Sequence, residues 1–148
     1  MAILAAEHVR RFGIDPKIAL LSHSDFGTYD TDSARKMRRA LDILTELRPD
    51  LEADGEMQAD TALSEVLRDV KLSSSRLRGE ANVLVMPNLD AANIAFQLTR
   101  MLADALPVGP ILIGAAKPAH ILNRAITVRG VVNMTSVAVV EAQVVQNG

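Results

Sequence analysis

Hydrophobic residues in this chain occur in two patterns, compact runs and stripes with helical spacing. The runs Lys17–Ser22 and Asn82–Pro87 have the length of buried strands, and Leu51–Gly55 and Ile111–Ile113 are shorter strand candidates. Between these runs, apolar residues recur every three or four positions, which predicts amphipathic helices. The predicted stripes are Ala34, Met37, Leu41, Leu44 and Leu47, with Pro49 closing the helix; Ala59, Ala62, Leu63, Val66, Leu67 and Val70; and Ala91, Ile94, Ala95, Leu98, Met101 and Leu102, capped by Asn88 or Asp90.

Both ends of the chain also predict helices. Residues 2–12 form a short apolar stretch that Gly13 and then Pro16 stop. Residues 128–145 are rich in valine, which favours a strand, but their length favours a buried helix capped by Thr127. Helices therefore alternate with strands, which is typical of a three-layer αβα fold around a largely parallel sheet. Residues 71–80 are predicted to be a surface connection.

Composition narrows the class of protein. The 148 residues suit one domain, and with 49% hydrophobic but only 3% aromatic residues its core must consist of Ala, Val, Leu, Ile and Met. A net charge of −2 gives no case for nucleic acid or an anionic membrane as a partner. The absence of cysteine excludes disulfides and thiolate chemistry, and no apolar segment reaches the ~20 residues of a membrane span. We therefore expect a cytoplasmic domain.

Polar side chains follow three of the predicted strands. Because the carboxyl ends of parallel strands share one edge of a sheet, the loops after these strands are expected to face one crevice. The arrangement suits a phosphate-bearing ligand held by helix N-termini, although ordinary capping and loop roles explain the same residues. The candidates are Ser22, His23 and Ser24 after the first strand, Asn88 and Asn93 after the third, and Lys117, His120, Asn123 and Arg124 after the last.

The loop after the last predicted strand is better equipped to bind than to catalyse. Between Lys117 and Asn133 it carries the cation Arg124 but no carboxylate, cysteine or serine, and Thr127 is its only hydroxyl. His120 has no obvious carboxylate nearby in the sequence to orient it, as a general base needs. We therefore interpret His120 as a structural or ligand-edge residue.

Clusters of charge elsewhere have simpler interpretations. The cluster Arg35, Lys36, Arg38 and Arg39 is expected to be a solvated face balanced by acidic neighbours, with a contact to a nucleotide phosphate as the alternative. His8 and His23 are too isolated to indicate a metal site. Alternating acidic residues predict one exposed face of a strand rather than a cation site. These acidic positions are Asp50, Glu52, Asp54, Glu56 and Asp60, and the residues expected to balance the basic cluster are Asp30, Asp32 and Asp42.

Four strings of the chain resemble the phosphate acetyltransferase (phosphotransacetylase) family in a single register from about Lys17 to Gln143. They are Lys17-Ile-Ala-Leu-Leu-Ser-His-Ser, Pro49-Asp-Leu-Glu-Ala-Asp-Gly-Glu-Met-Gln, Gly79-Glu-Ala-Asn-Val-Leu-Val-Met-Pro-Asn-Leu-Asp-Ala-Ala-Asn-Ile-Ala and Gly109-Pro-Ile-Leu-Ile-Gly-Ala-Ala-Lys-Pro. The resemblance implies an isocitrate/isopropylmalate dehydrogenase-like fold, of which this chain is a partial copy. It divides the chain into an N-terminal helix and linker, residues 1–16, and the C-terminal half of a phosphotransacetylase-like domain, residues 17–146.

Within that family, the chain most resembles the phosphotransacetylase-like domain at the C-terminus of large bacterial NADP-dependent malic enzymes. The active transferases are expected to carry Ser-Arg where this chain has Asn123-Arg124, and an aspartate, the proposed base for the CoA thiol, at Gly130. Loss of a general base typically costs about 10²–10⁴ in rate. The resemblance therefore implies a domain that keeps Arg124 to hold an anion and has lost catalysis.

The resemblance leads to three hypotheses for function. The first is a regulatory domain that senses acetyl-CoA, or a related acyl-CoA or acetyl phosphate, in a parent chain that oxidises and decarboxylates malate to pyruvate with NADP and a divalent metal. The second is an active phosphate acetyltransferase in which His120 or another group replaces the lost carboxylate. The third is an oligomerisation scaffold, because the valine-rich last helix is apolar on nearly all sides and suits a homo-oligomer interface. No metal is implied in this chain itself.

Overall fold

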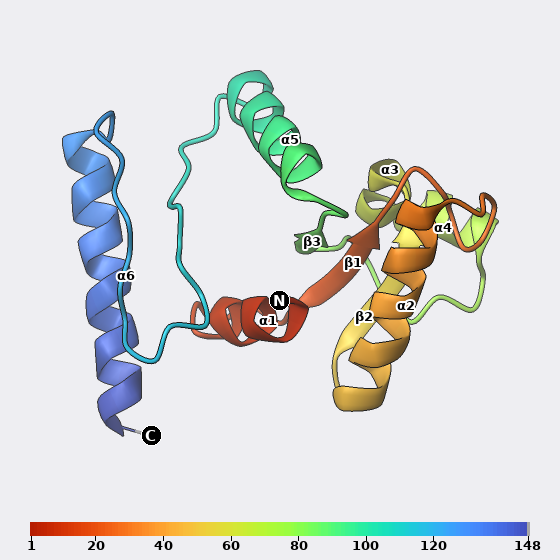
Figure 1. Ribbon diagram of the computed structural model, residues 1–148, viewed down its shortest axis with the longest axis horizontal. Coiled ribbons are helices and arrows are strands. Elements are labelled where there is room, and N and C mark those ends of the chain that lie inside the picture. The colour runs from red at the N-terminus through yellow and green to blue at the C-terminus, as the bar shows by residue number, and fades with distance from the viewer. Residues whose placement is uncertain (148) are drawn as a thin grey trace. The chain divides into compact units, whose positions relative to one another are not determined.

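The computed structural model describes residues 1–147 and the side chains of residues 1–144. The chain forms two compact units, Met1–Gln97 and a second that begins at Leu98. The boundary falls within α5 (Leu89–Leu102). Figure 1 shows the course of the chain through both units.

A parallel three-stranded sheet lies at the centre of the first unit, with the strand order β2-β1-β3. The central strand β1 spans Lys17–Leu21, and β2 (Glu52–Met57) and β3 (Val83–Val85) flank it. Every residue of β1 from Ile18 onward is buried, as expected for a strand with neighbours on both sides and helices on both faces. The sequence predicted all three strands, at slightly different bounds.

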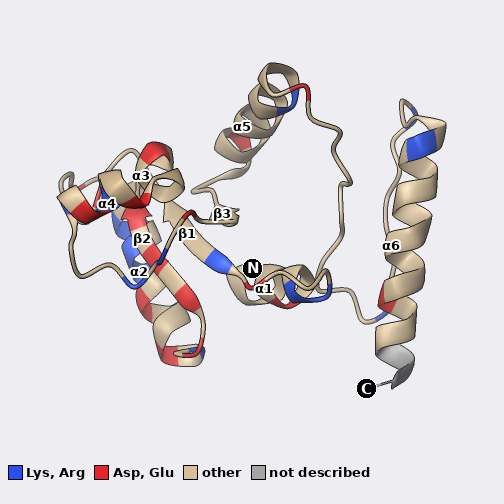
Figure 2. Cartoon of the chain, turned by 180° about the vertical axis from the view of Figure 1, so that it is seen from behind, with Lys and Arg blue, Asp and Glu red and all other residues tan. Residues whose placement is uncertain are grey.

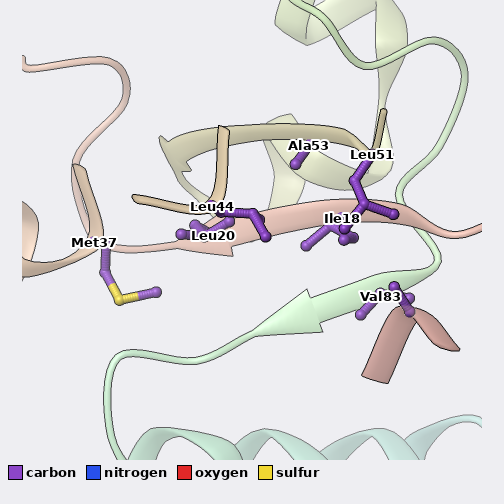
Figure 3. Close-up of a cluster of buried hydrophobic side chains, with 8 residues drawn as sticks. Ile18, Leu20, Met37, Leu44, Leu51, Ala53 and Val83 are labelled. Carbon is purple, nitrogen blue, oxygen red and sulfur yellow. The ribbon is translucent and has the colours of Figure 1, made fainter. Parts of the chain in front are cut away.

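Helices α1 (Ala2–Arg10) and α2 (Asp32–Leu47) cover one face of this sheet. Side chains of alternate β1 residues point to this face, where Ile18 and Leu20 pack with residues of the neighbouring strands and of α2. Figure 3 shows this cluster, whose buried members are Ala6, Ile18, Leu20, Met37, Leu44, Leu51, Ala53 and Val83. The α2 stripe was predicted correctly at Ala34, Met37 and Leu44, whereas Leu47 is 64% exposed.

The opposite face of the sheet packs against two short helices and the chain that follows them. Helix α3 (Ala59–Leu63) contributes Ala62, and the segment between α4 (Glu65–Lys71) and β3 contributes Leu77 and Ala81. The prediction of residues 71–80 as a surface connection holds for most of the segment but is wrong for Ser75 and Leu77, which are buried. Together, the two faces give a three-layer α/β architecture.

The predicted helix over residues 59–70 is interrupted at Ser64, which has extended backbone angles and begins α4 by accepting a hydrogen bond from the Leu67 N–H at 3.3 Å. Because the break turns the second half of the stripe, Val66 and Val70 are largely exposed. Among the described residues of α5 none is buried, so its predicted stripe does not cover a core here.

The second unit consists of the end of α5, an irregular loop and the long helix α6 (Val128–Asn147). Residues Ile111–Ile113 pair with no strand, so the prediction of a fourth strand is wrong for the described structure. The choice of a helix for the valine-rich segment is confirmed, and Thr127 caps it by accepting a hydrogen bond from the Gly130 N–H at 3.1 Å. The prediction that this helix is buried is wrong, because among its described side chains only Met134, Val137 and Glu141 are buried. Figure 2 shows that α6 carries few charged residues.

Candidate functional site

The carboxyl edge of the sheet carries three of the predicted site residues, all in the first unit. Ser22 follows β1, and its backbone N–H bonds the Met57 carbonyl at 2.9 Å. Asn88 follows β3 and caps α5 by accepting from the Ala91 N–H at 2.8 Å, which confirms the predicted cap. Asn93 lies one turn further along α5 and is exposed. Because β1 and β3 are adjacent and parallel, Ser22 and Asn88 lie at the same edge.

A buried carboxylate fixes the loop that follows β1 at this edge of the sheet. Glu56, at 0% exposed, accepts hydrogen bonds through Oε1 from the Ser24 hydroxyl (2.7 Å), the Gly27 N–H (2.9 Å) and the Arg38 guanidinium (2.9 Å). These bonds shape the loop after β1, which leads into α2. Buried carboxylates normally need such pairing. Ser24, one of the sequence candidates, thus has a structural role.

The acidic alternation in β2 is not an exposed strand face, as the sequence predicted. Asp54 is buried like Glu56, and its Oδ2 accepts from the Ser75 hydroxyl at 2.7 Å and the Arg76 N–H at 2.8 Å. The donors come from segments distant in sequence, so the pattern of β2 alone does not reveal them. Both carboxylates hold neighbouring loops onto the sheet.

The basic cluster on α2 is a balanced surface, as predicted. Arg35 pairs with Asp30 at 2.8 Å and with Asp32, and Arg38 pairs with Asp30 at 2.8 Å besides Glu56. The guanidinium groups therefore already have anionic partners, and the alternative of a nucleotide-phosphate contact receives no support from this geometry.

The other predicted site residues, Lys117, His120, Asn123 and Arg124, belong to the second unit. Lys117 and Arg124 are exposed, and neither has a hydrogen bond or ion pair within the described part of the chain. Asn123 closes its own turn, since its side-chain oxygen accepts from the Ala125 N–H at 3.0 Å. The loop thus offers a guanidinium and an amide side by side in sequence, both of them donors.

A cavity of about 200 Å³ opens at the N-terminus of α6 in this second unit. Two arginines, Arg100 and Arg129, line it together with the Thr127 cap, Gly130 and Asn133. No carboxylate is among the lining residues of this cavity, and the first N–H groups of α6 add partial positive charge. Its electrostatics therefore favour an anion. Neither arginine was among the predicted site residues. For Arg129 the available signal was a cation at the start of an apolar helix, whereas Arg100 lies in the last turn of α5.

Gly130 is closely surrounded where a side chain would begin. A Cβ at this position would lie 2.6 Å from Cγ1 of Ile126, nearer than van der Waals contact allows. An aspartate at residue 130 therefore requires Ile126 to change its rotamer. The local packing is fitted to glycine.

His120 has a carboxylate partner that the sequence analysis did not find. Nε2 of His120 lies 3.0 Å from Oε2 of Glu141 on α6, and both side chains are more than nine-tenths buried. The two atoms are within contact distance but are not aligned as a hydrogen bond. Nδ1 of the same ring accepts from the Leu112 N–H at 3.3 Å. The prediction that His120 lacks a nearby carboxylate is wrong, because Glu141, 21 positions further along the sequence, meets it only in the fold.

Acidic groups are scarce throughout the second unit. From residue 98 onward the sequence contains only two carboxylates, Asp104 and Glu141, against the four cations Arg100, Lys117, Arg124 and Arg129. Glu141 is already in contact with His120. Among the described residues of the whole chain, no group of three or more histidine, aspartate or glutamate side chains is placed to hold a metal ion. No helix of the described chain is long and apolar enough to cross a membrane.

Comparison with known proteins agrees with this fold. Phosphate acetyl/butaryl transferase is the family whose pattern matches residues 1–139. The chain belongs to this family. Two solved phosphotransacetylases, EutD from Staphylococcus aureus and one from Streptococcus pyogenes, superpose with TM-scores of 0.89 at 33% and 35% identity. They are matched over 95% and 99% of this chain but over 44% of their own length.

Relatives within the phosphate acetyl/butaryl transferase family fall into two groups. An NAD-dependent malic enzyme of Rhizobium meliloti is 58% identical over 95% of this chain, and an NADP-dependent malic enzyme of Escherichia coli is 51% identical over 97%. A phosphate acetyltransferase of Clostridium acetobutylicum is 39% identical over 97%. The chain spans 18% and 19% of the two malic enzymes and 43% of the acetyltransferase. It is therefore homologous to a phosphotransacetylase-like segment of malic enzymes.

Proposed function

We propose that this chain is a regulatory segment of a malic enzyme, which binds acetyl-CoA or a related acyl-CoA without transferring the acetyl group. The chain is more similar in sequence to malic enzymes than to the phosphate acetyltransferase, which supports its assignment as a segment of a malic enzyme. In this proposal the parent chain oxidises malate with NAD or NADP and a divalent metal in a domain outside this segment, and the intact protein is a homo-oligomer.

The cavity at the start of α6 is the observation that carries the proposal. It presents Arg100 and Arg129 beside Gly130, where the family resemblance implies the base of the transferases. At about 200 Å³ it has room for a phosphate or thioester end but not for a whole acyl-CoA. Arg124 and the Asn123 amide, on the adjoining loop, add donors for a carbonyl or phosphate oxygen. A thiol has a reference pKa near 8.5, so without a base it stays mostly protonated at neutral pH.

Regulation requires that the ligand bind more tightly to one arrangement of the parent protein than to another. Such coupling typically amounts to ~1–3 kcal/mol, which corresponds to roughly a 5–150-fold change in affinity. We propose inhibition of malate oxidation as the output. Ser22, Asn88 and Asn93, at the carboxyl edge of the sheet in the first unit, stay proposed ligand contacts in their own right.

The test uses the full-length protein. Malate oxidation is measured against acetyl-CoA concentration for wild type and Arg124→Ala, each as a fraction of its own uninhibited rate. Arg124→Ala is expected to raise the half-inhibiting concentration at least about tenfold, because a guanidinium–phosphate or guanidinium–carbonyl contact is lost. Arg78→Ala is the matched control, since Arg78 is an exposed arginine outside the second unit. Equal inhibition in all three proteins would contradict the assignment of Arg124.

An active phosphate acetyltransferase is the second candidate, favoured by the family match and by 39% identity to such an enzyme. It requires a proton acceptor for the CoA thiol. His120 is poorly suited, because one ring nitrogen accepts from the Leu112 N–H and the other faces Glu141. Acetyl transfer from acetyl phosphate to CoA by the full-length protein, abolished by His120→Ala, would establish this candidate instead.

The scaffold alternative rests on exposed apolar surface. On α6, Val128 is 84% exposed and Val132 is 58% exposed. If the segment is a scaffold only, calorimetry on the full-length protein will show no heat with acetyl-CoA.

A further inference from the structure

The contact between His120 and Glu141 joins α6 to the loop before it, which also carries Asn123 and Arg124. The two side chains are 4% and 7% exposed, so the pair is almost completely removed from solvent. Glu141 lies in the fourth turn of α6, and His120 lies three residues before Asn123 in the loop. The backbone of Leu112 completes the arrangement from the other end of the same loop.

The hydrogen bond from the Leu112 N–H determines which nitrogen of the neutral His120 ring carries the proton. Because Nδ1 accepts an N–H donor, it carries no proton, and the neutral ring then bears its proton on Nε2, the atom that faces Glu141. The imidazole thus links two parts of the loop with the helix. A ring that is hydrogen-bonded at Nδ1 and packed against a carboxylate at Nε2 suits a positioning role better than that of a base.

Burying this polar pair among apolar side chains costs free energy, so we expect the pair to have a specific role. His120 borders an apolar cavity of about 350 Å³ lined by side chains that include Leu122, Met134 and Val139. Replacing a buried polar pair by apolar residues is often neutral or stabilising, so its presence is poor evidence for stability. Such pairs can select a single register, because sliding the loop by one residue removes the contact while an apolar contact would tolerate the shift.

We propose that His120 and Glu141 form a clasp, meaning this contact together with the Leu112 hydrogen bond, that positions Asn123 and Arg124 for the acyl-CoA. His120 and Glu141 are positioning residues, since they act through Arg124 and do not touch the ligand. This inference rests on the proposed function. It assigns to Glu141 a role in affinity for the acyl-CoA although it lies 17 residues from Arg124 in sequence.

The test is a set of variants in the full-length protein, with inhibition by acetyl-CoA as the readout. His120→Ala and Glu141→Ala are each expected to raise the half-inhibiting concentration about tenfold, and the double variant is expected to be no worse than the more severe single variant. In an Arg124→Ala background, Glu141→Ala is expected to have no further effect. A general loss of structure would instead add to the effect of Arg124→Ala, so additive effects would overturn the proposal.

Glu141→Gln separates positioning from folding. It keeps the volume of the side chain and an oxygen able to lie against Nε2, so inhibition within about threefold of wild type is expected. A Glu141→Gln variant as defective as Glu141→Ala would overturn the assignment of Glu141 as a residue that positions the loop through this contact. The two proposals fail differently: wild type insensitive to acetyl-CoA contradicts the proposed function, whereas sensitive wild type with unaffected clasp variants contradicts the clasp alone.

Discussion

Arg68 is the side chain on which the second face of the first unit most depends. It is fully buried, and its guanidinium donates to the carbonyls of Thr61 (3.2 Å), Leu77 (3.3 Å) and Gly79 (2.6 Å), with a longer bond to Ala62. These bonds connect α3 and α4 to the segment that leads into β3. Arg68→Met keeps most of the apolar stem and removes the donors.

The magnitude follows from the carbonyls that lose their donor. The carbonyl of Ala62 keeps a hydrogen bond from the Ala81 N–H at 3.0 Å, so three carbonyls bear most of the loss. At about 1 kcal/mol for each bond, the variant loses about 3 kcal/mol of unfolding free energy. For a unit of this size that corresponds to a fall in Tm of about 12–24 °C. Arg68→Lys is expected to recover part of this, because an ammonium group reaches fewer of the carbonyls.

Thermal and urea unfolding of the 148-residue chain, followed by circular dichroism, measures the loss. Asp69→Ala is the matched control on the same helix, because Asp69 is exposed, and it is expected to change stability by less than about 0.5 kcal/mol. A loss below about 1 kcal/mol in Arg68→Met would refute the reasoning. It would mean that the guanidinium does not hold the segment before β3.

Three further predictions concern the loops around the sheet. Glu56→Ala is expected to cost about 2–4 kcal/mol in urea unfolding, because the Ser24 hydroxyl and the Gly27 N–H lose their acceptor while Arg38 keeps its pair with Asp30; a loss of less than about 1 kcal/mol would argue against the network. Gly55→Ala is expected to yield little folded protein, since the new Cβ would lie 2.6 Å from the backbone oxygen of Leu20 at a φ of +146°; wild-type solubility and Tm would disprove this clash. Burial alone raises the pKa of Asp25, but hydrogen bonds from Lys71, the Gln58 N–H and Thr61 outweigh it and hold that pKa below its ordinary 3.8. The ionised Asp25 carboxylate therefore stabilises the fold fully above about pH 4, and this stabilisation is lost as the pH falls through the lowered pKa. The difference in stability between wild type and Asp25→Asn should shrink between about pH 7 and pH 3. A difference independent of pH would contradict the charge pairing.

The sequence predicted the elements whose pattern is local. Helices α1, α2, α5 and α6 and strands β1 and β3 each have an apolar run or stripe complete within one segment. The Thr127 and Asn88 caps were predictable for the same reason, since each bonds an N–H three residues ahead. Local pattern also explains the false strand at Ile111–Ile113, because an apolar run does not specify a pairing partner.

The residues that the sequence analysis misjudged depend on distant partners. Asp54 and Glu56 are buried because Ser75 and Arg38 meet them in the fold, and no spacing within β2 indicates this. For the same reason, no local spacing indicates that Glu141 is the partner of His120. Its position in an otherwise apolar helix was the available signal, since a lone carboxylate among valines normally has a partner.

Acetyl-CoA binding and acetyl transfer, measured on one sample of the full-length protein, test the central claim most directly. Calorimetry is expected to show saturable binding of acetyl-CoA, while the same sample forms no acetyl-CoA from acetyl phosphate and CoA above the rate without protein. Turnover that saturates with both substrates would contradict the claim, since a proton acceptor for the thiol would then be present despite Gly130.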